Sequence, residues 1–106
     1  MITIPIFKKA GPFAENKDVA QDIRVHEIMP ALERNEEVIL DFEKVGAATQ
    51  SFIHALISEP LRKYGQAALD QLAFKSCNDT VKKIITIVVD YMQEGMGIET
   101  TENPEK

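Results

Sequence analysis

Cysteine is nearly absent from this chain of 106 residues, since Cys77 is the only one. A single thiol excludes an internal disulfide and a metal site made of several thiolates. This composition fits a reducing compartment, and we expect a cytoplasmic protein. The N-terminus also lacks a basic segment followed by a long apolar run, so it predicts neither a signal peptide nor a membrane span.

Basic residues are also scarce. The chain carries 12 Lys and Arg against 17 Asp and Glu, which gives a formal net charge of -5 at pH 7. Because affinity for phosphate backbones depends on clustered Lys and Arg, this balance disfavours nucleic acid as a partner. It equally disfavours an anionic membrane surface. A content of 44% hydrophobic residues argues against disorder, and the length allows one domain with a single core.

The sequence does contain an alternation of strand and helix patterns. The expected strands are residues 2–7, 38–42 and 71–76, and the expected helices are residues 18–32, 50–64 and 79–95. The order β-α-β-α-β-α predicts an α/β fold with a small, mainly parallel sheet and covering helices. Residues 1–95 would form this single domain, and the polar residues 96–106 would form a frayed tail.

Proline and capping residues mark where we expect the first elements to begin and end. Pro5 cannot donate a ladder hydrogen bond, which predicts that the first strand lies at a sheet edge. The segment Lys8–Pro12 would break this strand. Asp18 is the expected cap of the first helix, and Pro30 implies that this helix ends near Met29 or kinks there.

The later elements have clearer boundaries. The continuous apolar run Val38–Phe42 is typical of a strand buried on both faces of a parallel sheet. Gly65 is the expected C-cap of the second helix, and Asn78 the expected N-cap of the third. Residues 84–89 are β-branched, but the cap and the helical period favour a helix that ends at Gly95.

The junction between the second strand and the second helix gathers most of the polar candidates. In open α/β sheets, sites form where the carboxyl end of a strand faces the amino end of a helix. Free backbone N–H groups at a helix start favour an anion there by about 0.3 to 1 kcal/mol per charge. The candidate partner-binding or ligand-binding residues of this junction are Asp41, Glu43, Lys44, Thr49, Gln50 and Ser51.

Plainer structural roles compete with each candidate. Thr49 could simply cap the helix, with Ser51 as an early helix residue, and Asp41 could accept a hydrogen bond from a turn N–H. Arg24 could reach the Asp41 carboxylate or a phosphate, although a solvated helix face is the simpler account. His54 could act as a base, but a partly buried, hydrogen-bonded histidine is simpler, because no metal ligand stands three or four residues away.

No motif supports catalysis. The chain has no Gly-x-Gly-x-x-Gly, no phosphate-loop signature and no Gly-x-Ser-x-Gly elbow. Cys77 is best explained as a small residue that fills the core. The sequence around His26 offers no better set of catalytic or metal-binding residues than that around His54. We therefore expect no catalytic residue, no metal and no cofactor, and we rank a small hydrolase using His54 or Cys77 last.

The segment from Leu40-Asp41-Phe42 to Thr49-Gln50-Ser51 resembles the centre of STAS domains, the fold of anti-sigma factor antagonists. It is more specifically similar to uncharacterised small bacterial STAS-like domains, in which the Tyr64-Gly65 helix end and the strand at 72–76 also recur. The resemblance covers roughly residues 20 to 93. It implies a STAS-like fold and a non-enzymatic regulatory module whose protein partner is a histidine-kinase-like ATPase or kinase.

The resemblance also implies a role for the helix start. In the antagonists the partner kinase phosphorylates the first Ser of this turn, and the complex then breaks. The ungapped match places Gln50 at that phosphoacceptor position, where no phosphate can be accepted, so Ser51 or Thr49 would have to serve. The alternative function is a small-molecule or nucleotide-binding sensor that uses the helix N-terminus at Thr49–Ser51. The oligomeric state is left open.

Overall fold

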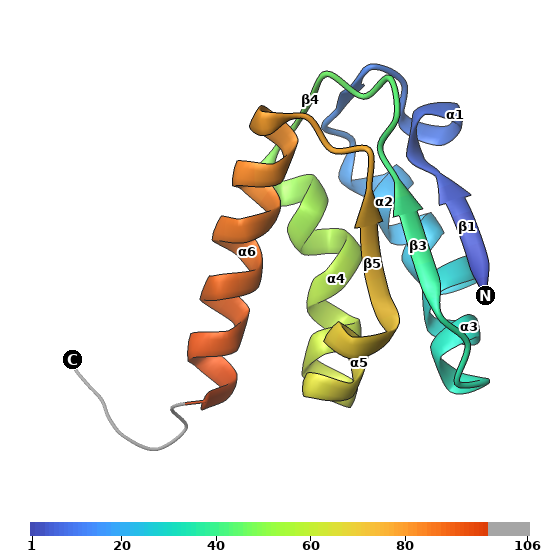
Figure 1. The fold of residues 1–106 in the computed structure, drawn as a ribbon, viewed down its shortest axis with the longest axis vertical. Coiled ribbons are helices and arrows are strands. Elements are labelled where there is room, and N and C mark those ends of the chain that lie inside the picture. The colour runs from blue at the N-terminus through green and yellow to red at the C-terminus, as the bar shows by residue number, and fades with distance from the viewer. Residues whose placement is uncertain (98–106) are drawn as a thin grey trace.

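The computed structural model describes residues 1–97 and contains a three-stranded parallel sheet. Its strands are β1 (Ile2–Pro5), β3 (Val38–Asp41) and β5 (Leu72–Lys75), in the spatial order β1-β3-β5 (Figure 1). All pairs are parallel. The α/β class and the edge position of β1 are therefore confirmed.

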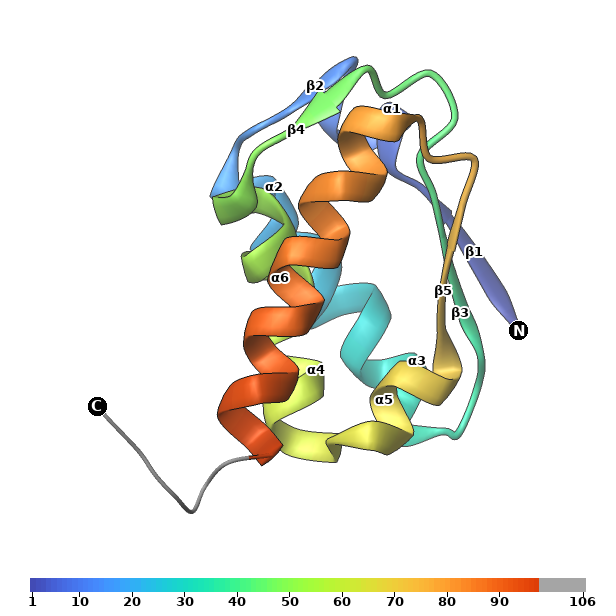
Figure 2. The same ribbon diagram turned by 60° about the vertical axis from the view of Figure 1, so that its left-hand side comes forward.

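Helices cover one face of this sheet. Helices α2 (Lys17–Ile23), α4 (Gln50–Tyr64) and α6 (Asp79–Gly97) all lie on the same side of the strands (Figure 2). On the other face Ile39 and Asp41 are partly exposed. The expectation that the central strand is buried on both faces is therefore wrong. The helices cover only the face that carries Val38 and Leu40.

The N-terminal segment differs from the prediction. The first strand ends at Pro5, and α1 (Ile6–Ala10) follows in place of the expected break, with Ile6 fully buried in the core. A second short strand, β2 (Phe13–Ala14), then leads to α2. The cap of α2 is Asn16 and not Asp18, since the Asn16 side chain accepts a hydrogen bond of 2.8 Å from the Asp18 N–H.

The first long helix does not end at Met29. It continues through a π-helical turn, η1 (Arg24–Ile28), into α3 (Met29–Glu33). The Met29 N–H donates to the carbonyl of Arg24, five residues back, which widens the helix just before Pro30. The chain thereby accommodates a residue without an N–H at the start of α3.

A two-stranded parallel sheet outside the main one positions the site. Strand β4 (Ala47–Ala48) pairs with β2, and the Thr49 N–H donates to the carbonyl of Ala14 at 3.0 Å (Figure 2). Because α2 follows β2 and α4 follows β4, this pairing sets the two helix starts side by side. The sequence pattern did not predict either strand.

The C-terminal half follows the prediction closely, apart from the short helix α5 (Gln66–Gln71). Gly65 ends α4 with a positive φ of 61°, and its N–H donates to the carbonyl of Leu61. Asn78 caps α6, since its side chain accepts from the Val81 N–H at 2.8 Å. Helix α6 runs two residues beyond the expected end at Gly95, and residues 98–106 of the predicted tail lie outside the described residues.

Among the described residues, no helix combines the length and the apolar character needed to cross a membrane.

Candidate functional site

Buried aromatic rings fix both ends of the predicted junction. Phe42, after the central strand, and Phe52, in the first turn of α4, are both completely buried. Next to Phe42, the Asp41 carboxylate accepts a hydrogen bond of 3.0 Å from the Glu43 N–H. The structural role considered for Asp41, pairing with a turn N–H at the strand end, is thus confirmed.

The turn residues Glu43 and Lys44 are exposed but lie apart from the start of α4. Lys44 adopts a positive φ of 72°, and its Nζ stands 6.0 Å from the centroid of the Phe7 ring on α1. Gly46, two residues further on, is held from two sides. Its N–H donates to the Pro12 carbonyl, and its carbonyl accepts from the Asn78 side-chain amide. This turn is therefore a fixed connection, and the Lys44 ammonium group lies near α1.

Thr49 and Ser51 have different roles at the helix start. The Thr49 hydroxyl accepts a hydrogen bond of 3.1 Å from the Phe52 N–H and is partly buried, so Thr49 is the N-cap of α4. Gln50 and Ser51 are both exposed. The structure assigns the structural role to Thr49 and leaves the side chains of Gln50 and Ser51 accessible.

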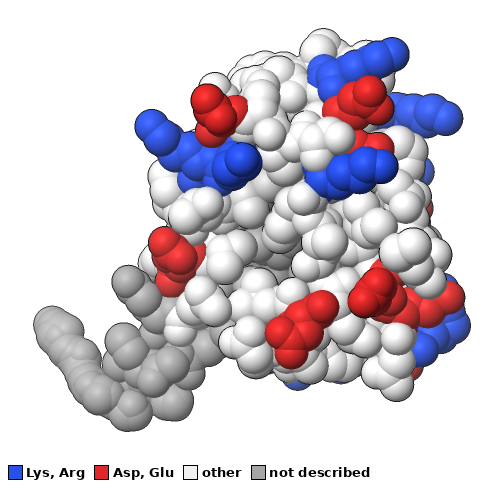
Figure 3. Space-filling view, viewed as in Figure 1, with Lys and Arg blue, Asp and Glu red and all other residues white. Residues whose placement is uncertain are grey.

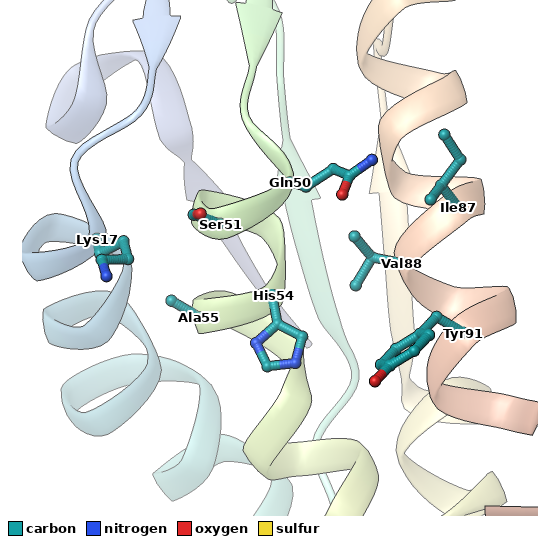
Figure 4. Close-up of a pocket in the computed structure, with 8 residues that line it drawn as sticks. All are labelled: Lys17, Gln50, Ser51, His54, Ala55, Ile87, Val88 and Tyr91. Atoms are coloured by element: carbon teal, nitrogen blue, oxygen red, sulfur yellow. The ribbon is translucent and has the colours of Figure 1, made fainter. Parts of the chain in front are cut away.

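Gln50, Ser51 and His54 line a cavity of about 440 Å³ between α4, α6 and the first residue of α2, which we call the α4–α6 groove (Figure 4). Its lining residues are Lys17, Gln50, Ser51, His54, Ala55, Ile87, Val88 and Tyr91. Ile87 is 43% exposed and Tyr91 is 68% exposed, so α6 contributes an apolar wall that is open to solvent.

The polar groups of the groove come from the α4 and α2 side. Ser51 points toward α2 and Lys17, and Gln50 points toward α6 (Figure 4). The imidazole of His54 lies below both of them in this view, beside the Tyr91 ring. No carboxylate is among the described lining residues. A hydroxyl, an amide, an imidazole and an ammonium group can thus hydrogen-bond a docked group that also packs on Ile87 and Tyr91.

Sequence reasoning missed Lys17, Ile87 and Tyr91. Ile87 and Tyr91 are four residues apart and fall outside the buried stripe of α6, which is Val81, Ile85, Val88 and Met92. Two apolar residues at this spacing, outside the stripe that packs on the core, were the sequence signal from which an exposed apolar surface on this helix could have been predicted.

Arg24 does not reach Asp41, and it is not simply a solvated residue either. Its Nη1 donates a hydrogen bond of 3.1 Å to the carbonyl of Ala55, which ties η1 to α4. Arg24 thus supports the helix that carries the groove residues. His26 is exposed, and its Nδ1 lies 3.0 Å from the Asp22 carboxylate.

Cys77 and His54 do not form a reactive pair, because they line separate cavities on the two sides of α6. Burial raises the pKa of the Cys77 thiol, and the nearby Lys82 opposes this shift only partly. The thiol is therefore protonated at neutral pH and is a weak nucleophile. Within the part of the chain that the structure describes, no group of three or more His, Cys, Asp and Glu side chains could hold a metal ion.

A parallel sheet with helices on one face, and a capped helix that starts beside a groove after the central strand, define a small α/β domain. A family model described as a STAS-like domain of unknown function (DUF4325) matches residues 20–82, which is more than half of the chain. The chain belongs to this family. The matched segment includes β3, the helix start at Thr49–Phe52 and the Tyr64-Gly65 helix end. Searches among curated proteins and among solved structures gave no match.

Proposed function

We propose that this protein is a non-enzymatic regulatory module that binds a protein partner through the α4–α6 groove. The observation that carries this proposal is the solvent-exposed pair Ile87 and Tyr91, which stands directly beside the accessible polar groups of the α4 start. Protein interfaces combine an apolar, often aromatic centre with a polar rim, and this groove offers both.

The class of partner follows from the STAS-like resemblance. In the anti-sigma factor antagonists, the helix start after the central strand meets a histidine-kinase-like ATPase. Here the corresponding helix start is at Thr49–Phe52, and Gln50 and Ser51 are exposed. We therefore favour an ATPase or kinase of that class as the partner.

Ser51 is the better phosphoacceptor candidate of the two hydroxyl residues. It is exposed and lines the groove, whereas Thr49 is partly buried and its hydroxyl already caps α4. A phosphate would add a charge of about -1.5 to -2 beside the apolar wall of Ile87 and Tyr91. Because a charged group is costly to desolvate in a docked interface, phosphorylation of Ser51 would weaken partner binding.

Affinity capture from the native cell with matched variants tests this assignment. Ile87→Asp places a charge in the groove, and Val25→Asp places the same charge on η1, where Val25 is 47% exposed and outside the groove. We expect the wild-type chain and Val25→Asp to retain a histidine-kinase-like ATPase, identified by mass spectrometry. Ile87→Asp and Ser51→Glu should lose it, and Ser51→Ala should keep it.

Equal retention by Ile87→Asp and Val25→Asp would show that the partner binds elsewhere. Absence of any ATPase from the wild-type capture would contradict the partner class. Intact mass of the recovered chain, with and without phosphatase treatment, shows whether Ser51 carries a phosphate.

A second candidate is a sensor for a small anionic ligand, such as a nucleotide. The volume of the groove, about 440 Å³, is within the range of small-molecule sites, and Lys17 supplies a positive charge beside Ser51. Calorimetric titration of the full chain with ATP, ADP and inorganic phosphate tests this. Heat that disappears in Lys17→Ala would favour the sensor, whereas no heat and no thermal shift would remove it.

A further inference from the structure

The outer side of β5 is an open sheet edge. In the spatial order β1-β3-β5, strand β5 has a neighbour on one side only among the described residues. Lys75 faces β3, because its carbonyl accepts from the Phe42 N–H at 2.9 Å. Backbone groups alternate in direction along a strand, so the N–H and C=O of Phe74 face outward, as does the C=O of Leu72.

The opposite edge of the sheet is blunted, whereas the β5 edge is not. On β1, Ile2 faces β3 through its N–H, which donates to Glu37, so Thr3 and Pro5 face outward. Pro5 has no N–H, and one outward donor is therefore missing there. Strand β5 contains no proline, and its outward groups are those that an added strand needs.

A recess of about 380 Å³ lies next to this open edge, between β5 and α6. Its lining residues are Phe74, Ser76, Cys77, Lys82, Ile85 and Thr86. Phe74 is partly exposed and Ile85 provides an apolar floor. A strand added beside Phe74 would place every second side chain into this recess, which favours an apolar residue there.

The charges at the edge select the occupant. Lys82 is the charged residue among the described lining residues, and Lys75 is exposed on β5 itself, beside Asp41 of β3. Figure 3 shows Lys and Arg side chains on the upper part of the molecule, with Asp and Glu side chains among them. A second copy of the chain would bring its own Lys75 and Lys82 to the same edge, where like charges would oppose pairing.

From these observations we infer that the β5 edge binds an extended, acidic segment of another polypeptide, which adds a fourth strand to the sheet. The backbone of Phe74 supplies the ladder hydrogen bonds, and the recess takes an apolar side chain. Lys75, which lies on the open face of the sheet, faces the acidic side chains of the added strand. This surface is separate from the α4–α6 groove, so the inference does not depend on the proposed function.

The test uses a fluorescent peptide of alternating valine and glutamate, titrated against the full chain by anisotropy. An alternating valine and lysine peptide of the same length is the control ligand. Lys75→Glu should weaken binding about fivefold, the upper range for one exposed charge pair. Lys83→Glu makes the same charge change on α6, outside the β5 edge and its recess, and should have little effect.

Backbone pairing is tested at Phe74. Phe74→Pro removes the outward donor, while Phe74→Ala loses the same ring but keeps the N–H. We expect Phe74→Pro to bind about tenfold more weakly than Phe74→Ala, as the loss of one hydrogen bond predicts. Hydrogen exchange of the Phe74 amide in the wild-type chain, measured by NMR, should slow when the acidic peptide is added.

Three results would overturn the inference. The first is no binding of the acidic peptide, or binding that is equal for Lys75→Glu and Lys83→Glu. The second is protection of the Phe74 amide without peptide that increases with protein concentration, which would identify a second copy as the occupant. The third is protection without peptide at all concentrations, which would identify another part of the same chain.

Discussion

The two hydroxyl residues at the start of α4 show how position separates structural from accessible residues. Thr49 and Ser51 are close in sequence, and by residue type either could cap the helix or bind a partner. In the structure the Thr49 hydroxyl accepts from the Phe52 N–H, and Ser51 is exposed in the α4–α6 groove. The capping bond therefore decides which of them is free for function.

Removal of the Thr49 hydroxyl should destabilise the protein. We expect Thr49→Ala to lower the free energy of unfolding by about 1 kcal/mol, because the Phe52 N–H would lose its acceptor. Ser51→Ala should change it by less than about 0.5 kcal/mol, as is usual for an exposed position. Urea denaturation followed by circular dichroism measures both values. Equal losses in the two variants would contradict the assignment of the cap.

At the scale of elements, the sequence predicted those that repeat an apolar pattern over enough residues. The strand at Val38, helix α4 and helix α6 lie where they were expected, with the caps Gly65 and Asn78. Strands β2 and β4 have two residues each and carry no periodic pattern. Their pairing depends on tertiary contacts between distant segments, which a local pattern cannot express.

The groove was predicted only in part for the same reason. Gln50 and Ser51 were candidates because they begin the helix that follows the central strand, and His54 because its imidazole could act as a base. Lys17 and Tyr91 come from α2 and α6, and they meet these residues only once the helices pack together. Asp41, Glu43 and Lys44, which the strand-to-helix rule grouped with them, are not among the lining residues.

The contact between η1 and α4 gives a prediction for the helix layer. Arg24 donates to the Ala55 carbonyl at 3.1 Å from a partly buried position, so Arg24→Ala should cost about 1 kcal/mol of stability. Arg62 is the control, because it is exposed and its Nη1 is 3.6 Å from the Glu59 carboxylate. Arg62→Ala should change the free energy of unfolding by less than about 0.5 kcal/mol. Similar losses in the two variants would show that the bond to Ala55 adds no stability.

At the scale of the whole molecule, one layer of helices on one face of a small sheet leaves several surfaces available. Helix α6 contributes to two of them. Ile87 and Tyr91 line the α4–α6 groove on one flank, and Lys82 and Thr86 line the recess beside β5 on the other. The two proposed surfaces share a helix but no lining residue, so a molecule bound at one would leave the lining residues of the other uncovered.

The sheet topology predicts an alternating pattern of hydrogen exchange in the full chain without a ligand. Parallel pairing on one side of β5 directs the amides of Ala73 and Lys75 toward β3 and the amide of Phe74 outward. Exchange should therefore be slow for the amides of Ala73 and Lys75 and fast for the amide of Phe74. Strand β3 has a neighbour on each side, so its amides from Ile39 to Phe42 should all be protected. NMR-detected exchange under native conditions measures each amide.

The control for this pattern is the other edge, where the Thr3 amide faces outward and should exchange as fast as that of Phe74. Uniform protection along β5 would contradict the open edge, because it requires an acceptor for the Phe74 N–H. Uniformly fast exchange would contradict the β3–β5 pairing itself. Only the alternating pattern is consistent with both the register of the sheet and a free edge beside the recess.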